Sequence, residues 1–168
     1  LRRGEGPAAA HIGTHGSDKV TGTAGPDVIM GLGGNDTIEG RSGDDQICAG
    51  PGNDSVRGDD GHDTIYGEDG DDQLKGGRDN DFLYGGNGKD RLEGEVDHDH
   101  LFGDSGNDQL YGGPGDDGLV GDDGMDLLDG MSGHDGLFGG AGADTLIGGS
   151  EDDFLDGGAD NDTRRGSP

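Results

Sequence analysis

Residues 103–111 read GDSGNDQLY and residues 31–39 read GLGGNDTIE, so both stretches carry Gly, Gly, Asp and an aliphatic residue at positions one, four, six and eight. From Gly13 this nine-residue spacing continues without insertion or deletion through Arg165, a span of 17 units. Self-similarity at a fixed short period is typical of solenoids, in which each repeat packs on its neighbours. The repeat therefore predicts the fold more strongly than any single motif does.

Position six is the most regular position, because it is Asp in all 17 units. Position one is Gly in 16 units, with Ala49 as the exception, and position four is Gly in 13. Position eight is Val, Ile or Leu in 16 units and is charged only at Arg164. A disordered acidic tract would scatter its aspartates, whereas here they keep register over 153 residues.

The composition excludes several classes of protein. The chain has 168 residues, of which 42 are Gly and only 26% are hydrophobic, and it has no Trp, so an ordinary globular core is excluded. Its net charge of -27 repels a phosphate backbone, so we expect no nucleic-acid partner. No run of 18 apolar residues occurs, and we therefore expect no membrane span.

The spacing of the unit also predicts how it folds. In a short strand at positions seven to nine, position eight faces one side while positions seven and nine face the other. The aliphatic residues from Val20 to Leu155 would then form one buried row between two thin sheets. Glycines at positions one and four are expected to adopt the positive φ angles of a tight turn, and successive turns would stack about 4.8 Å apart.

Stacking would bring the position-six carboxylates of every second unit into a column. Bare carboxylates about 5 Å apart repel one another, so each column requires a cation. Carboxylates together with carbonyls of a glycine-rich turn suit Ca²⁺ better than Mg²⁺, and soft metals are disfavoured by a single Cys and the lack of a recurring His pair. The candidate ligands are Asp18, Asp27, Asp36, Asp45, Asp54, Asp63, Asp72, Asp81, Asp90, Asp99, Asp108, Asp117, Asp126, Asp135, Asp144, Asp153 and Asp162.

Two columns of stacked loops leave fifteen gaps between the 17 units, so we expect up to about 15 Ca²⁺ ions. Their charge would nearly neutralise the net charge of -27. A single row of aliphatic residues is too small a core to offset the conformational entropy of the chain. We therefore expect the calcium-free chain to be largely disordered and calcium binding to drive folding.

The unit resembles the RTX, or haemolysin-type, calcium-binding nonapeptide Gly-Gly-x-Gly-x-Asp-x-U-x, in which U is a large aliphatic residue. The resemblance covers residues 13–165. It implies an all-β fold, a parallel β-roll (a β-solenoid) with two repeats per turn and calcium bound in the loops. It also implies a secreted, extracellular protein whose repeats assist the secretion and folding of an attached enzyme, toxin or adhesin.

The ends of the chain lie outside the pattern. Residues 1–12 are expected to be an N-terminal leader or linker remnant, residues 13–165 the roll and residues 166–168 a tail. Arg164 places a charge at the aliphatic position, which favours a capping end over a linker to a further segment. Cys48 lies at position nine, and the sequence leaves open whether it is a free thiol or pairs with a segment outside the chain.

Catalysis is not expected. The chain contains no nucleophile elbow, P-loop or His-Glu-x-x-His motif. Acid pairs such as Asp122-Asp123 are common in so acidic a chain and lack an apolar pocket that would raise a pKa. His98 and His100 flank Asp99 and could indicate a transition-metal site, but we expect their side chains to diverge.

One surface feature leaves an alternative function open. Tyr66, Tyr84, Phe102, Val120 and Phe138 occupy position nine at intervals of 18 residues, and we call them the aromatic ladder. They are expected to stack on the outer face of one sheet and stabilise the rod. The alternative is a calcium-stiffened adhesive or structural spacer that uses the ladder as a docking stripe for an attached domain, a partner or a second copy.

Overall fold

The chain folds into two parallel sheets of nine strands each, and a computed structural model describes its residues 9–166. Successive strands alternate between the sheets, so we call them the odd sheet and the even sheet. The odd sheet contains β1 (Ala9–Ile12), β3 (Asp27–Met30), β5 (Gln46–Cys48), β7 (Thr64–Asp69), β9 (Phe82–Gly88), β11 (His100–Gly106), β13 (Gly118–Asp123), β15 (Gly136–Ala141) and β17 (Phe154–Ala159). The even sheet contains β2 (Lys19–Thr21), β4 (Thr37–Ser42), β6 (Ser55–Asp60), β8 (Gln73–Arg78), β10 (Arg91–Val96), β12 (Gln109–Pro114), β14 (Leu127–Ser132), β16 (Thr145–Ile147) and β18 (Thr163–Arg165).

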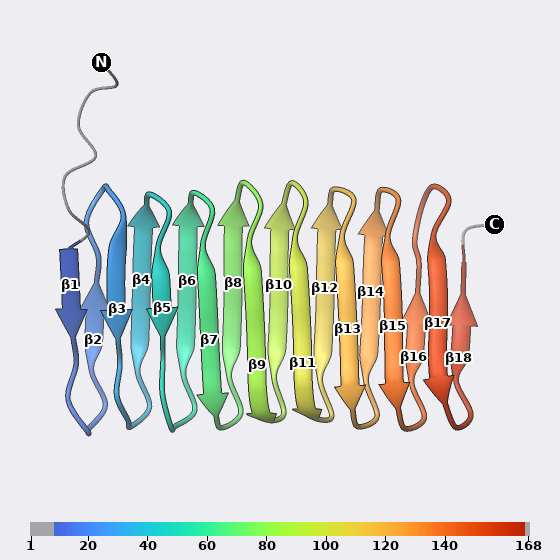
Figure 1. Cartoon of the computed structure of the whole chain (residues 1–168), viewed down its shortest axis with the longest axis horizontal. Helices are drawn as coiled ribbons and strands as arrows, with labels where there is room; N and C mark the ends of the chain where they lie inside the picture. Colours follow the sequence, from blue (N-terminus) through green and yellow to red (C-terminus); the bar gives the residue numbers. More distant parts are fainter. Residues whose placement is uncertain (1–8, 167–168) are drawn as a thin grey trace, which may run out of the picture.

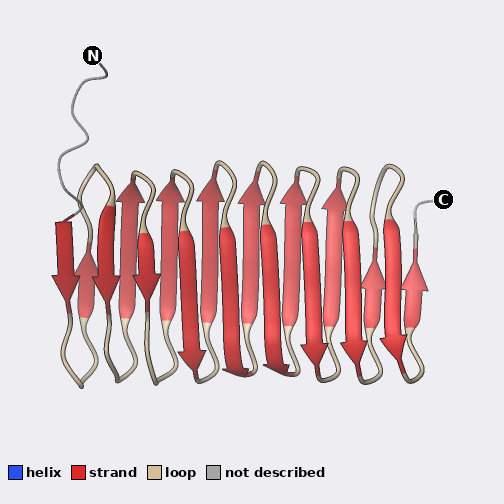
Figure 2. Cartoon of the chain, in the orientation of Figure 1, coloured by secondary structure: helices blue, strands red, loops and turns tan. Residues whose placement is uncertain are grey.

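The strands run across the long axis of a rod, and the loops line its two long edges (Figure 1). Each strand pairs with the strand 18 residues further along the chain, as Leu83 does with Leu101 and Leu101 with Leu119. Figure 2 shows only strands and loops over the described residues. None of these residues forms a helix that is long and apolar enough to span a membrane. The prediction of an all-β parallel β-roll with two repeats per turn is therefore confirmed.

The N-terminal end of the roll includes a strand that the repeat does not predict. Ala9–Ile12 forms β1 and pairs in parallel with β3, so that His11 lies beside Ile29 and Ile12 beside Met30. These residues belong to the segment that the sequence assigned to a leader. Residues 1–8 of that segment, and residues 167–168 of the expected tail, lie outside the described residues.

The core is the single row of position-eight side chains that the sequence predicts. From Ile29 to Leu146 each of these aliphatic residues is fully buried, while Val20 and Leu155 near the two ends are partly buried. Position-six aspartates and position-one glycines lie on the same inner side, so burial alternates along each strand. Most strands extend over six or seven residues rather than three, because the backbone of positions one to three also pairs with the neighbouring turns.

The prediction of positive φ at position one is wrong, whereas at position four it is confirmed from Gly34 onward but not at Gly16 or Gly25. Positive φ occurs at position two, where even Leu32 and Arg41 adopt 82° and 88°, and at position four, as in Gly106 at 151°. Position one continues the strand, and none of its glycines has a positive φ. Glycine at position one is therefore needed for another reason, which is the space that its missing side chain leaves beside the neighbouring atoms.

Candidate metal sites

The position-six aspartates form two columns that follow the edges of the roll. The first column runs from Asp18 to Asp162 at the start of the even-sheet strands, and the second from Asp27 to Asp153 at the start of the odd-sheet strands. Fourteen of these residues are at most 4% exposed; they are Asp27, Asp36, Asp45, Asp54, Asp63, Asp72, Asp81, Asp90, Asp99, Asp108, Asp117, Asp126, Asp135 and Asp144. The fold thus brings the predicted ligands together in the expected stacks.

One oxygen of each carboxylate links neighbouring turns. The backbone N–H of Asp81 donates to Oδ1 of Asp99, and the N–H of Asp99 donates to Oδ1 of Asp117, each over 2.8 Å. The same bond recurs along both columns, from Asp18 donating to Asp36 up to Asp144 donating to Asp162. From Asp36 and Asp45 onward, each aspartate therefore satisfies a backbone donor of the preceding turn.

The other oxygen has no donor along most of each column. Oδ2 is buried and without a hydrogen-bond partner in Asp36, Asp45, Asp54, Asp63, Asp72, Asp81, Asp90, Asp99, Asp108, Asp117, Asp126, Asp135, Asp144 and Asp153. A buried carboxylate oxygen without a partner is costly, and native proteins satisfy such groups with a donor, a water or a metal ion. Fourteen such oxygens, seven in each column, are suited to binding cations.

The glycine at position one keeps a small volume free beside all of these oxygens except Oδ2 of Asp54, whose unit has Ala49 at that position. A Cβ built on Gly103 would stand 2.7 Å from Oδ2 of Asp108 and 2.9 Å from the carbonyl oxygen of Gly121 in the next turn. The corresponding distances at Gly85 are 2.6 Å to Asp90 Oδ2 and 2.8 Å to the carbonyl oxygen of Gly103. We call this volume the cradle; carboxylate and carbonyl oxygens, the ligands that Ca²⁺ prefers, converge on it.

The side chains alone do not make a closed metal site. Among residues 9–166 no group of three or more His, Cys, Asp or Glu side chains converges as a metal site would require. Backbone carbonyls must therefore supply part of any ligand set, as they do in other flexible calcium loops. A donor set of oxygen only, spread over two turns of backbone, fits Ca²⁺ and disfavours metals that require nitrogen or sulfur ligands.

Burial makes ionisation of the columns unfavourable in the absence of a cation. Burial, with a smaller contribution from neighbouring carboxylates, raises the pKa of Asp81 and of Asp99 to about 8. The pKa values of Asp63, Asp72, Asp108 and Asp135 rise to about 7 for the same reasons, mainly burial. The columns are therefore destabilised by their own negative charge at neutral pH, and a bound cation would offset that charge.

The two N-terminal loops differ from the others in a way that the repeat pattern does not predict. The backbone N–H of Thr14 donates to Oδ2 of Asp18 over 2.6 Å, and the Thr14 hydroxyl donates to the same oxygen over 2.8 Å. Thr23 likewise donates its backbone N–H to Oδ2 of Asp27. Both threonines lie at position two, and neither has a positive φ. Threonine at this position in the first two units is the sequence feature that could have indicated these hydrogen bonds.

In the C-terminal loop, too, a side chain contacts the carboxylate at position six. The Arg164 guanidinium lies 3.9 Å from Oδ2 of Asp162, the last aspartate of the first column. Arg164 occupies the aliphatic position of the last unit and is exposed. At the first and last aspartates of the first column, donors or a positive charge from the chain itself thus lie beside the carboxylate.

The histidines flanking Asp99 do not converge. Nδ1 of His98 accepts a hydrogen bond of 2.7 Å from the backbone N–H of Asp116 at the edge of the roll. The ring of His100 instead stacks on Phe82 on the outer face of the odd sheet, with 4.9 Å between ring centroids. The two imidazoles therefore belong to different surfaces.

The aromatic ladder lies on the outer face of the odd sheet, as predicted. Tyr66 stacks on Tyr84 and Tyr84 on Phe102, with centroid separations of 4.9 and 4.8 Å and nearly parallel planes. Phe138, beyond Val120, contacts Phe154 in a tilted arrangement. Because the rings cover one another's faces, the observed contacts are those of a stabilising cross-strand ladder.

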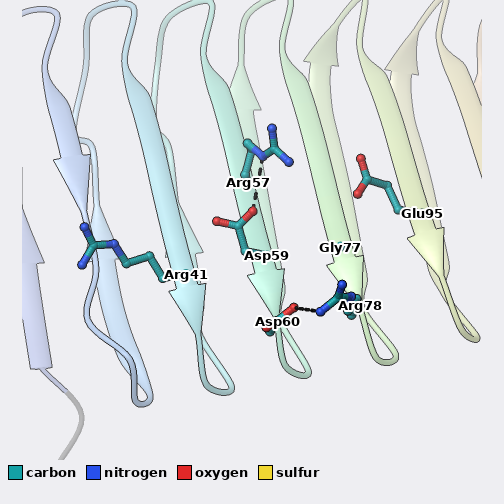
Figure 3. A pocket seen from close by; sticks show the side chains of 7 residues that line it. All are labelled: Arg41, Arg57, Asp59, Asp60, Gly77, Arg78 and Glu95. Carbon is teal, nitrogen blue, oxygen red and sulfur yellow. Dashed lines mark hydrogen bonds and ion pairs between the residues drawn. The ribbon is translucent and has the colours of Figure 1, made fainter.

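A surface hollow of about 390 Å³ lies on the even sheet and is lined by charged residues (Figure 3). Arg57 pairs with Asp59 over 3.4 Å and Arg78 pairs with Asp60 over 3.2 Å, whereas Arg41 points away from Arg57. Glu95 completes the lining and lies close to Lys75. Positive and negative groups are balanced here, so the hollow is an exposed set of ion pairs and does not favour an anionic or a cationic ligand.

Two edge columns of buried carboxylates, each beside a glycine cradle with a carbonyl oxygen, define a cation-binding parallel β-roll. The family model described as RTX calcium-binding nonapeptide repeat (4 copies) matches residues 12–47, 49–83, 84–119, 120–155 and 129–163. The chain belongs to this family of calcium-binding repeat proteins. A search of curated proteins found no match to the chain.

Proposed function

We propose that the chain is a secreted module that folds on binding many Ca²⁺ ions and supports the secretion and folding of an attached or parent protein. The observation that carries the proposal is the two columns of buried Oδ2 atoms without a hydrogen-bond partner, fourteen atoms in all. Family membership supports calcium as the ion. The raised pKa values of the columns supply the reason why the fold depends on it.

The ligands that we assign are Oδ2 of the position-six aspartates and the carbonyl oxygen of position one in the following turn. Bound calcium would supply positive charge and coordination to these oxygens. Asp18 and Asp27 differ from the other aspartates, because threonine donors already satisfy their Oδ2 atoms. Asp162 lies beside the Arg164 guanidinium. The interior aspartates of both columns are therefore the main binding residues.

The proposed location follows from the required calcium concentration. Extracellular calcium modules are tuned to about 10⁻⁴–10⁻³ M, a range found outside cells and not in the cytosol. A chain whose columns repel themselves without calcium would stay unfolded inside the cell and fold after export. A folded scaffold formed only at the destination would then support the folding of whatever protein is attached to it.

We further propose that the chain has no catalytic activity of its own. The carboxylates with raised pKa values are the groups that would otherwise be candidates for acid–base catalysis. Those of the two columns are at most 4% exposed and face the neighbouring turns, so a substrate could not approach them. In the hollow on the even sheet, Arg57 and Arg78 are paired with Asp59 and Asp60.

Equilibrium dialysis across micromolar to millimolar free calcium tests the binding step directly. We expect each chain to bind many calcium ions at the calcium concentrations at which extracellular modules bind them. Binding should be cooperative, because each ordered turn orders the loop of the next turn. Magnesium is the matched control and should bind far less, because it demands a rigid octahedron and keeps its waters. A chain that binds no calcium at millimolar concentrations overturns the proposal.

A further inference from the structure

Ala49 is the single position-one residue that carries a side chain. All sixteen other units have glycine there. Ala49 is fully buried and belongs to the core cluster formed by the aliphatic row. Its unit contributes Asp54 to the first column, and Oδ2 of Asp54 is one of the buried oxygens without a donor.

The backbone at Ala49 follows the same path as at the neighbouring glycines. The Ala49 N–H donates to the carbonyl oxygen of Tyr66 over 2.9 Å, as the N–H of Gly31 does to Cys48 over 2.8 Å. Asp54 also keeps its place in the column, since its own N–H donates to Oδ1 of Asp72 over 2.8 Å. The Ala49 methyl group therefore points in the direction that a Cβ would take at a position-one glycine.

That direction leads into the cradle. At Gly85 and Gly103 the point reached by a Cβ is 2.6–2.7 Å from a carboxylate oxygen and 2.8–2.9 Å from a carbonyl oxygen. These separations are shorter than an ordinary contact between a methyl carbon and an oxygen, so a methyl group at this position must push aside the carboxylate and carbonyl oxygens that would ligate the ion. A methyl group offers no ligand and cannot be displaced by the ion.

We propose that Ala49 blocks calcium binding at its own turn, so that the Asp54 cradle stays without an ion when the other interior cradles are filled. This inference rests on the proposed function, since it concerns which of the sites are used. The methyl group replaces the ion with an apolar contact to the core. The first column is thereby interrupted at its third aspartate, two turns from Asp18, whose Oδ2 is held by Thr14.

The test is to count the ions bound by the full chain and by its Ala49→Gly variant with native mass spectrometry at saturating calcium. The substitution restores the residue found in every other unit, so the variant is expected to fold. We expect it to bind one more calcium ion than the parent chain. Ala143→Gly is the matched control, because it makes the same chemical change at an exposed position five and should leave the count unchanged.

The outcomes separate the inference from the function on which it rests. Equal counts in Ala49→Gly and in a parent chain that binds many ions would overturn the blocking role of Ala49 and leave the proposed function intact. A parent chain that binds no calcium would overturn both. An extra ion in Ala143→Gly as well would show that glycine acts through backbone flexibility and would also overturn the inference.

Discussion

In the Asp99→Asn variant we expect opposite effects with and without calcium. Asp99 is fully buried, and its pKa is raised to about 8 by burial and then by the charges of Asp117, Asp97 and Glu95. Asparagine keeps the Oδ1 acceptor for the Asp81 N–H but removes the charge. The variant should therefore require more calcium to fold and bind fewer ions, yet it should be more stable than the parent in calcium-free buffer at pH 8.

Asp99→Ala distinguishes the ligand from the backbone acceptor. Alanine removes both oxygens, so the buried N–H of Asp81 loses its partner at a cost of about 1–3 kcal/mol. We expect this variant to be destabilised in both conditions, in contrast to asparagine. Denaturant titrations in saturating calcium, and in calcium-free buffer with a stabilising osmolyte, measure the two effects.

Asp123→Asn is the control for the loss of one negative charge. Asp123 is exposed at position three, outside both columns, and its substitution should change stability by no more than about 0.5 kcal/mol. If Asp99→Asn destabilised the calcium-free chain as strongly as the calcium-loaded chain, the column charge would not be the obstacle to folding. Such a result would contradict the role that we assign to the ion.

Calcium-free protein should gain β structure on acidification. The folded-state pKa values of Asp63, Asp72, Asp81, Asp99 and Asp108 are about 7 to 8, above the ordinary value of about 3.9 in an unfolded chain. Between these limits the folded roll binds more protons than the unfolded chain, so its stability falls as the pH rises from about 4 to 8. Protons would thus partly replace calcium by neutralising the columns.

Far-ultraviolet circular dichroism of calcium-stripped protein between pH 5 and pH 8 measures this effect. We expect the β signal to be larger at pH 5 and to decline towards pH 8. At limiting calcium the dependence should reverse, because protons then compete with calcium for the same carboxylates. A calcium-free chain whose β content rose with pH would contradict the raised pKa values.

Much of the fold could be predicted because each unit position has one physical role. The invariant Asp and the aliphatic residue two positions later must face the same side of a strand, so the core row and both columns follow from the register. The strand Ala9–Ile12 could not be predicted, because it pairs through its backbone and carries no residue of the repeat. A parallel strand of this kind requires only an open edge at β3, which side-chain periodicity does not report.

The role of the position-one glycine was misjudged for a related reason. Glycine permits both unusual φ angles and close approach, and the sequence does not distinguish the two. Positive φ falls at position two, where Leu32 and Arg41 accept it at some strain, whereas position one is glycine to keep the cradle free. The threonine donors of the first two loops were missed because only the three-dimensional register shows that position two reaches the carboxylate at position six.

Calcium-dependent folding is tested most directly by a titration of calcium-stripped protein at neutral pH, followed by far-ultraviolet circular dichroism with magnesium as control. We expect a cooperative change from coil to β structure at calcium concentrations of about 10⁻⁴–10⁻³ M and no such change with magnesium. Full β structure in calcium-stripped protein at neutral pH, unaffected by added calcium, would contradict it and would show a solenoid that supports itself.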